Sequence, residues 1–138
     1  MVEVTDKPIS PEPVIGRVKT DASGCVVAYI GLIRAYSRAK AVLSVEYEDV
    51  GGTAQARLQQ IADEAKQKWQ LENLAIAHRV GKLKVGDINL VVAVASAHRE
   101  EGFAACQYVI DQFKQNLPTQ KRETYQDGSI WVEDKNTG

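Results

Sequence analysis

Hydrophobic residues recur along the chain with two periods, one typical of strands and one typical of helices. Runs rich in β-branched residues predict strands at 2–5, 25–33, 42–48, 74–80, 89–96, 119–125 and 129–132. The run 25–33, CVVAYIGLI, is apolar on both faces, which predicts a central strand. We expect this strand to form a hairpin with 42–48 across a polar, mobile segment at 35–40. Residues 81–87, GKLKVGD, are predicted to form a turn, a short strand and a second turn.

Helical spacing and end signals predict three helices. Ser10 and Pro11 open a short helix that extends to about Lys19. Thr53 precedes a longer helix whose expected core stripe is Ala54, Leu58, Ile61, Ala65 and Trp69. A third helix follows Ala97, with an expected core stripe of Phe103, Cys106, Ile110, Phe113 and Leu117. Pro118 predicts its end near Gln115 or Asn116.

Interspersed strands and helices, joined by several connections of hairpin length, predict an α+β fold with a mixed or antiparallel sheet. The expected elements include about three helices and a small C-terminal hairpin around Asp127 and Gly128. A chain of 138 residues fits one domain, 1–138. Within it, 1–8 would carry an N-terminal edge strand and 134–138 a polar tail.

Composition narrows the class of protein. Hydrophobic residues make up 44% and charged residues 25% of the chain, as in ordinary globular proteins. A net charge of −1 argues against a general nucleic-acid binder, so any positive site must be local. Cys25 and Cys106 have no second Cys or His at metal-ligand spacing, and we interpret both as reduced core thiols. Without a secretion signal or a membrane-length apolar run, the expected location is the cytoplasm.

Cationic side chains occur beside four predicted structural breaks: Arg34, His98-Arg99, Lys114 and Lys121-Arg122. Each alone is most simply a solvated charge. Together they predict an anion site, because free backbone N–H groups at a helix start also favour an anion. Arg99 and Lys114 lie fifteen residues apart on one helix, about 22 Å along its axis. If both serve one site, a second copy of the chain must complete it across a two-fold axis.

The clustered lysines have two interpretations. Lys114 and Lys121, with Arg122, could bind an anion, or they could supply a reactive amine for nucleophilic or acid–base chemistry. No Ser-His-Asp set, metal cluster, carboxylate pair or glycine-rich phosphate loop competes with them in the sequence.

Several segments together resemble a known family. They are GCVVAYIGLIR, VLSVEYE, IAHRVGKLKVGD, VVAVASAHREEGFAACQYVIDQFK and PTQKRETYQDGSIWVE. In order and spacing they are similar to the large, catalytic subunit of molybdopterin synthase, from about Ile9 to Glu133. The resemblance implies an α/β hammerhead fold and a homodimer. Each subunit would bind a small ubiquitin-like subunit whose C-terminal Gly-Gly tail carries a thiocarboxylate.

The resemblance also implies a reaction. Two sulfurs pass to cyclic pyranopterin monophosphate, its cyclic phosphate opens, and the dithiolene of molybdopterin forms without a metal or cofactor at this step. The family's catalytic residues correspond to Lys114, beside the thiocarboxylate, and Lys121, on the pterin. Its substrate-binding residues correspond to Leu32, Ile33, Arg34, His98, Arg99, Arg122 and Glu123. Arg34 would hold the phosphate together with His98 and Arg99 of the partner subunit.

The chain departs from the family pattern at a few positions. Gln120 stands where an aromatic residue is common, Ala35 stands where Asn is common, and 51–54 lacks the usual methionine. Two alternatives therefore stay open: a non-catalytic homologue that binds a ubiquitin-like tail, and an unrelated phosphate-metabolite binding module.

Overall fold

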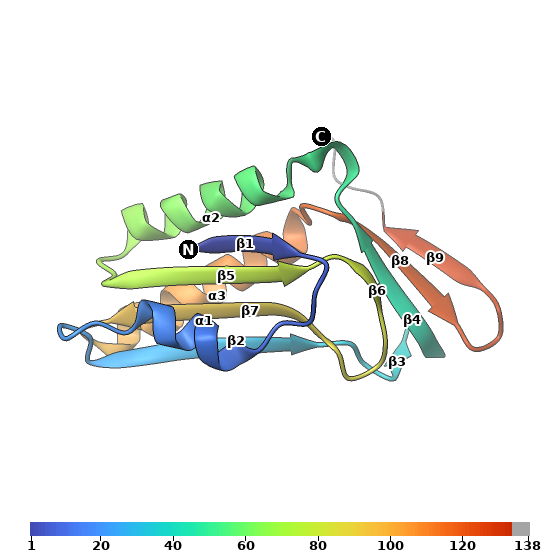
Figure 1. Cartoon of the computed structure of the whole chain (residues 1–138), viewed down its shortest axis with the longest axis horizontal. Coiled ribbons are helices and arrows are strands. Elements are labelled where there is room, and N and C mark those ends of the chain that lie inside the picture. The colour runs from blue at the N-terminus through green and yellow to red at the C-terminus, as the bar shows by residue number, and fades with distance from the viewer. Residues whose placement is uncertain (134–138) are drawn as a thin grey trace.

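In residues 1–133, two β-sheets organise the fold, and three α-helices pack on the two faces of the larger sheet (Figure 1). The structure is a computed structural model that describes residues 1–133, so the predicted tail at 134–138 lies outside the described residues. The expected α+β class is confirmed, with a single parallel pair, β1 with β5, in the described part of the larger sheet.

The larger sheet has the strand order β1 (Val2–Thr5), β5 (Asn73–Arg79), β7 (Ile88–Ser96), β2 (Cys25–Leu32). The prediction that 25–33 is a central strand is wrong, because among residues 1–133 β2 pairs with β7 alone and forms an edge. Ile30 and Leu32 are 43% and 56% exposed. An apolar run indicates that both faces of a strand are covered, but it does not show whether both backbone edges are paired. The pattern therefore could not distinguish a central strand from an edge strand.

The smaller sheet contains β3 (Tyr36–Ser37), β4 (Lys40–Glu48), β8 (Gln120–Tyr125) and β9 (Ile130–Glu133), with β6 (Gly81–Leu83) paired to β4. The predicted hairpin between 25–33 and 42–48 is wrong. Instead β4 forms a tight hairpin with β3, inside the segment predicted to be mobile. Arg38 and Ala39 have φ of 54° and 63°, the left-handed geometry that a two-residue hairpin turn requires. The C-terminal hairpin of β8 and β9 is confirmed.

The helices are α1 (Pro11–Val18), α2 (Ala54–Lys68) and α3 (Arg99–Gln115), with a short 3₁₀ turn at Val50–Gly52. The end of α3 at Gln115 is confirmed, but Phe103 is 61% exposed and does not belong to its core stripe. The buried face of α3 is Gly102, Ala105, Cys106, Val109 and Phe113. Small residues let this helix approach the sheet closely, since a Cβ at position 102 would meet Ser96 Oγ at 2.8 Å.

Alternate residues of β5 and β7 face two separate cores. Leu74, Ile76 and Val92 pack under α2 and α3, whereas the alanines between them pack against Val14 and Val18 of α1. The two cysteines are free, with Cys106 buried in the first core and Cys25 half-buried. Within residues 1–133, no helix has the length and apolar character to cross a membrane. The buried pair β5 and β7 is therefore the framework on which the site is built.

Candidate functional site

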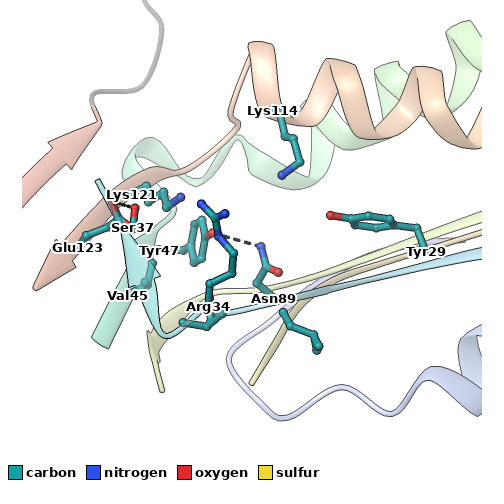
Figure 2. Close-up of a pocket in the computed structure, with 11 residues that line it drawn as sticks. Tyr29, Arg34, Ser37, Val45, Tyr47, Asn89, Lys114, Lys121 and Glu123 are labelled. Atoms are coloured by element: carbon teal, nitrogen blue, oxygen red, sulfur yellow. Dashed lines mark hydrogen bonds between the residues drawn. The ribbon is translucent and has the colours of Figure 1, made fainter. Parts of the chain in front are cut away.

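A hollow of about 360 Å³ lies at the C-terminal end of α3, where the two sheets meet (Figure 2). Its lining residues are Tyr29, Leu32, Ile33, Arg34, Ser37, Val45, Tyr47, Asn89, Lys114, Lys121 and Glu123. Six of the nine predicted site residues are in this set: Leu32, Ile33, Arg34, Lys114, Lys121 and Glu123. Segments distant in sequence thus converge on one place.

Three cations reach the hollow from three different elements. Arg34 follows the end of β2, Lys114 lies in the last turn of α3, and Lys121 lies near the start of β8. In Figure 2 the Lys114 amine extends from the helix toward the strands, where Arg34 and Lys121 lie. Within residues 1–133, none of the three is in an ion pair. A group of cations without acidic partners favours an anionic ligand.

The acid in the wall, Glu123, is buried at 3% exposure and is held by its neighbours. Its Oε1 accepts hydrogen bonds from Ser37 Oγ at 2.9 Å and from the Tyr125 hydroxyl at 3.1 Å. Arg38 Nε lies 3.8 Å from the same oxygen. Burial and the hydrogen bond to Glu123 raise the pKa of Tyr125, so this hydroxyl stays a donor. Glu123 is thus compensated from the wall, which leaves the three cations to a ligand.

Polar residues that were not predicted complete the hollow. Tyr47 on β4 is 5% exposed, and Asn89 on β7 donates from Nδ2 to the Tyr47 hydroxyl at 3.1 Å (Figure 2). Tyr29 and Ser37 also line the hollow. In the sequence, Tyr47 is a tyrosine in an alternating strand, and this pattern is common to half-buried strands with no functional site. Its site role becomes visible only through the register that pairs it with Lys121.

Arg122 is not brought to the hollow. Successive side chains of a strand point to opposite faces, so Lys121 and Glu123 face the hollow and the exposed Arg122 faces away. Its cross-strand neighbours are Glu46 and Val132.

His98 and Arg99 lie at the other end of α3, in a second, more open hollow. It is lined by Gly24, Cys25, Ala97, His98, Arg99, Glu100 and Glu101. His98 occupies the N-cap position of α3, and Arg99 is its first residue. The helix separates them from Lys114 by about 22 Å along its axis. One protomer therefore cannot present both ends to a small ligand.

The chemistry that this arrangement supports is recognition of an anion by cations from several elements. No group of three or more His, Cys, Asp or Glu side chains that could hold a metal ion occurs in residues 1–133. Exposed amines beside a guanidinium can stabilise developing negative charge, and an amine can also act as a nucleophile or move a proton.

Comparisons with known proteins point in one direction. The family model described as "MoaE protein" matches residues 4–116. The molybdopterin synthase catalytic subunit of Bacillus subtilis is 35% identical over 133 residues, covering 96% of this chain and 85% of the relative. The corresponding Nostoc sp. protein is 40% identical over 131 residues, covering 94% and 79%. A crystal structure of molybdopterin synthase from Staphylococcus aureus superposes with a TM-score of 0.87 at 30% identity, covering 95% of each chain.

Proposed function

This chain belongs to the MoaE protein family, and we propose that it is the catalytic subunit of a molybdopterin synthase, acting in molybdenum cofactor biosynthesis. The reaction would transfer sulfur from the C-terminal thiocarboxylate of a small ubiquitin-like subunit to cyclic pyranopterin monophosphate, giving the dithiolene of molybdopterin. The proposed location is the cytoplasm. The observation that carries the proposal is the convergence of Arg34, Lys114 and Lys121 on one hollow.

The proposed roles are those that the family resemblance implies, and the way in which each side chain reaches the hollow supports them. Lys114 lies on the helix side and would act beside the incoming thiocarboxylate, whereas Lys121 lies on the strand side and would act on the pterin. Arg34 would bind the phosphate, since a guanidinium suits bidentate contact with phosphate oxygens. Ile33 is buried and Leu32 exposed, so they would form an apolar wall and rim. Glu123 would hold the smaller sheet in place beneath the ligand.

A homodimer with a shared site would bring in His98 and Arg99. The hollow with His98 and Arg99 contains the starts of both β2 and α3, and the hollow with Lys114 contains the ends of both. The two elements therefore run side by side in the same direction. A two-fold axis across their middle would reverse them. It would place His98 and Arg99 of the partner subunit beside Lys114 and Arg34.

The surface along β2 and α3 fits such a contact. The strand edge of β2 is unpaired within the described chain, and a shallow apolar groove between β2 and α3 contains Val27, Phe103 and Ile110. Exposed Phe103 and Ile30 would be buried by a second copy. Pairing two β2 strands antiparallel is the arrangement that the two-fold axis requires.

Two other functions are less well supported. Gln120 and Ala35, which suggested a non-catalytic homologue, are not among the described residues that line the hollow. The cations of the hollow are present, so catalysis remains the better proposal. A phosphate-metabolite binding module would use the same cations without a protein partner.

A reconstitution separates the three. The purified chain is incubated with a thiocarboxylated small subunit and cyclic pyranopterin monophosphate, and the dithiolene is measured. Dithiolene formation is the expected result. Binding of the tail without product would favour the non-catalytic homologue, and binding of the pterin without the tail would favour the metabolite-binding module.

A further inference from the structure

Tyr47 and Asn89 form an uncharged pair beside the three cations of the hollow, and the proposed function gives this pair no role. The Tyr47 ring extends from β4, and its hydroxyl meets the Asn89 amide from β7 (Figure 2). Both elements are firmly held: Tyr47 is paired through its backbone to Lys121 and Gly81, and β7 is the buried centre of the larger sheet. Unlike a lysine amine on a flexible stem, this hydroxyl has a fixed position.

The direction of the hydrogen bond leaves the Tyr47 proton available. Asn89 Nδ2 donates to the hydroxyl oxygen at 3.1 Å, and among residues 1–133 the hydroxyl has no other hydrogen-bond partner. A phenol can accept and donate at once, so its own proton can point to a ligand in the hollow. Burial raises the pKa of Tyr47 above its ordinary value, which keeps the hydroxyl protonated beside the cations.

His78 of β5 supports this pair from below. Its Nδ1 lies 2.8 Å from the backbone carbonyl oxygen of Asn89. This oxygen can only accept a hydrogen bond, so Nδ1 carries the ring proton. Nε2 then accepts from Thr119 Oγ1 at 3.1 Å. Burial lowers the pKa of His78 to about 4, so the ring is neutral near pH 7, as this pattern requires.

The side-chain contacts of His78 lie within two residues of the hollow's lining. Its ring packs edge-on to Tyr47, with centroids 5.0 Å apart, and to Phe113, with centroids 4.9 Å apart. Phe113 precedes Lys114, and Thr119 lies two residues before Lys121. One buried imidazole therefore joins β4, β7, the end of α3 and the start of β8, the elements that carry Tyr47, Asn89 and the two lysines.

We infer that Tyr47 is a further substrate-contacting residue, whose hydroxyl donates a hydrogen bond to an anionic oxygen of the ligand, with Asn89 and His78 as positioning residues. The inference rests on the proposed function for the identity of the ligand. That oxygen belongs either to the phosphate of the pterin or to the C-terminal thiocarboxylate. A fixed neutral donor adds direction to the attraction of the cations, which by itself specifies position poorly.

The test compares Tyr47→Phe with Tyr108→Phe, a matched loss of one hydroxyl. Tyr108 on α3 donates to Glu64 Oε2 at 2.7 Å, at the contact with α2. Calorimetry measures the affinity of each variant for inorganic phosphate and for a small subunit that ends in an ordinary carboxylate. The same measurement on Arg34→Ala serves as a control for location: phosphate that binds in this hollow should lose affinity when Arg34 is removed. Unfolding transitions of all variants are recorded to exclude loss of fold.

Tyr47→Phe should lower the affinity for one of the two ligands about tenfold, the cost of losing a hydrogen bond to a charged group. The affinities of Tyr108→Phe should stay within about twofold of wild type. A loss for phosphate identifies the phosphate oxygen, and a loss for the tail identifies the carboxylate oxygen. Equal affinity of Tyr47→Phe and wild type for both ligands overturns the inference, as does an absence of binding by wild type. If wild type binds but forms no dithiolene, the proposed function fails while the affinities still decide the role of Tyr47.

A double-mutant cycle tests the positioning role of Asn89. If Asn89 acts through Tyr47, Asn89→Ala should weaken binding in the wild-type background and have little further effect in Tyr47→Phe. Thr119→Val, which removes the hydroxyl that donates to His78, should show the same dependence on Tyr47. Additive losses in both cycles would overturn the positioning roles, because a general structural defect would not depend on the Tyr47 hydroxyl.

Discussion

The two ends of α3 differ in a way that explains how the site is built. At the C-terminal end, Arg34, Lys114 and Lys121 surround a hollow, and the acid in its wall is compensated by Arg38 and two hydroxyls. At the N-terminal end, one arginine and one histidine share a more open hollow with two glutamates. The first end can bind an anion by itself. The second supplies only part of a site, and in the proposed homodimer it would gain a role when the second copy brings it to the first.

The largest effect should come from removing the amines at the C-terminal end. Lys114→Ala and Lys121→Ala should each lower the rate of dithiolene formation by roughly 10²- to 10⁴-fold, the usual range for a group that moves a proton or stabilises transition-state charge. Lys114 is exposed and Lys121 partly so, and neither is in an ion pair in the described chain. The free energy of unfolding should therefore change by less than about 0.5 kcal/mol. Wild-type rates in either variant would remove the basis for the comparison.

The next effect is on the free energy of unfolding. It arises from His78, which is buried beside the C-terminal end of α3. His78 has a pKa of about 4 in the folded chain and an ordinary value of 6.5, so the unfolded chain binds more protons. The contribution of His78 is complete above pH 6.5 and is lost as the pH falls to 4, by roughly 3 kcal/mol in total.

Urea unfolding at several pH values measures this loss. The free-energy difference between wild type and His78→Asn should shrink by about that amount from pH 7 to pH 4, because Asn does not titrate. A difference that stays constant with pH would contradict the burial of a neutral His78.

A smaller effect is expected from the compensated acid. Glu123→Gln should lower the free energy of unfolding by about 1 to 2 kcal/mol, since Ser37, Tyr125 and Arg38 lose a charged acceptor. The matched variant Glu46→Gln lies on the exposed face of the neighbouring strand and should change it by less than about 0.5 kcal/mol. Equal effects of the two variants on chemical denaturation would show that Glu123 is not held as described.

The smallest effect should come from Arg122. Because it faces away from the hollow, Arg122→Ala should reduce the rate of dithiolene formation by less than about threefold, far less than Lys121→Ala on the preceding residue. Steady-state rates of the two variants provide the measurement. A loss as large as that of Lys121→Ala would mean that Arg122 contacts a ligand or a partner outside this protomer.

Much of this comparison could be predicted from the sequence, since local pattern determines local structure. The end of α3 before Pro118 and the positions of β5 and β7 followed from backbone chemistry and periodicity. The local hairpin of β8 and β9 also followed, but pairing between distant strands did not, because it depends on contacts that local pattern does not record, and so β2 was placed at the centre of the sheet. Phe103 was placed in the core because the predicted stripe was drawn through large apolar residues. The buried face of α3 instead includes Gly102 and Ala105, whose small size lets the helix pack closely.

The candidate site divides in the same way. Cations beside chain breaks are visible in sequence, and six of the nine predicted residues line one hollow. The neutral members, Tyr47 and Asn89, resemble ordinary strand residues until the register of β4 and β7 brings them together. Arg122 was included for its charge, although the alternation of β8 directs it to the opposite face.

The most direct test of a site shared between the two ends of α3 is to mix two inactive chains. Lys114→Ala and Arg99→Ala subunits are dissociated and reassociated in equal amounts, and dithiolene formation is measured. If each site takes Lys114 from one copy and Arg99 from the other, half of the dimers are mixed and one of their two sites is intact, restoring about a quarter of wild-type activity. Activity that stays at the average of the two separate variants would contradict the shared site.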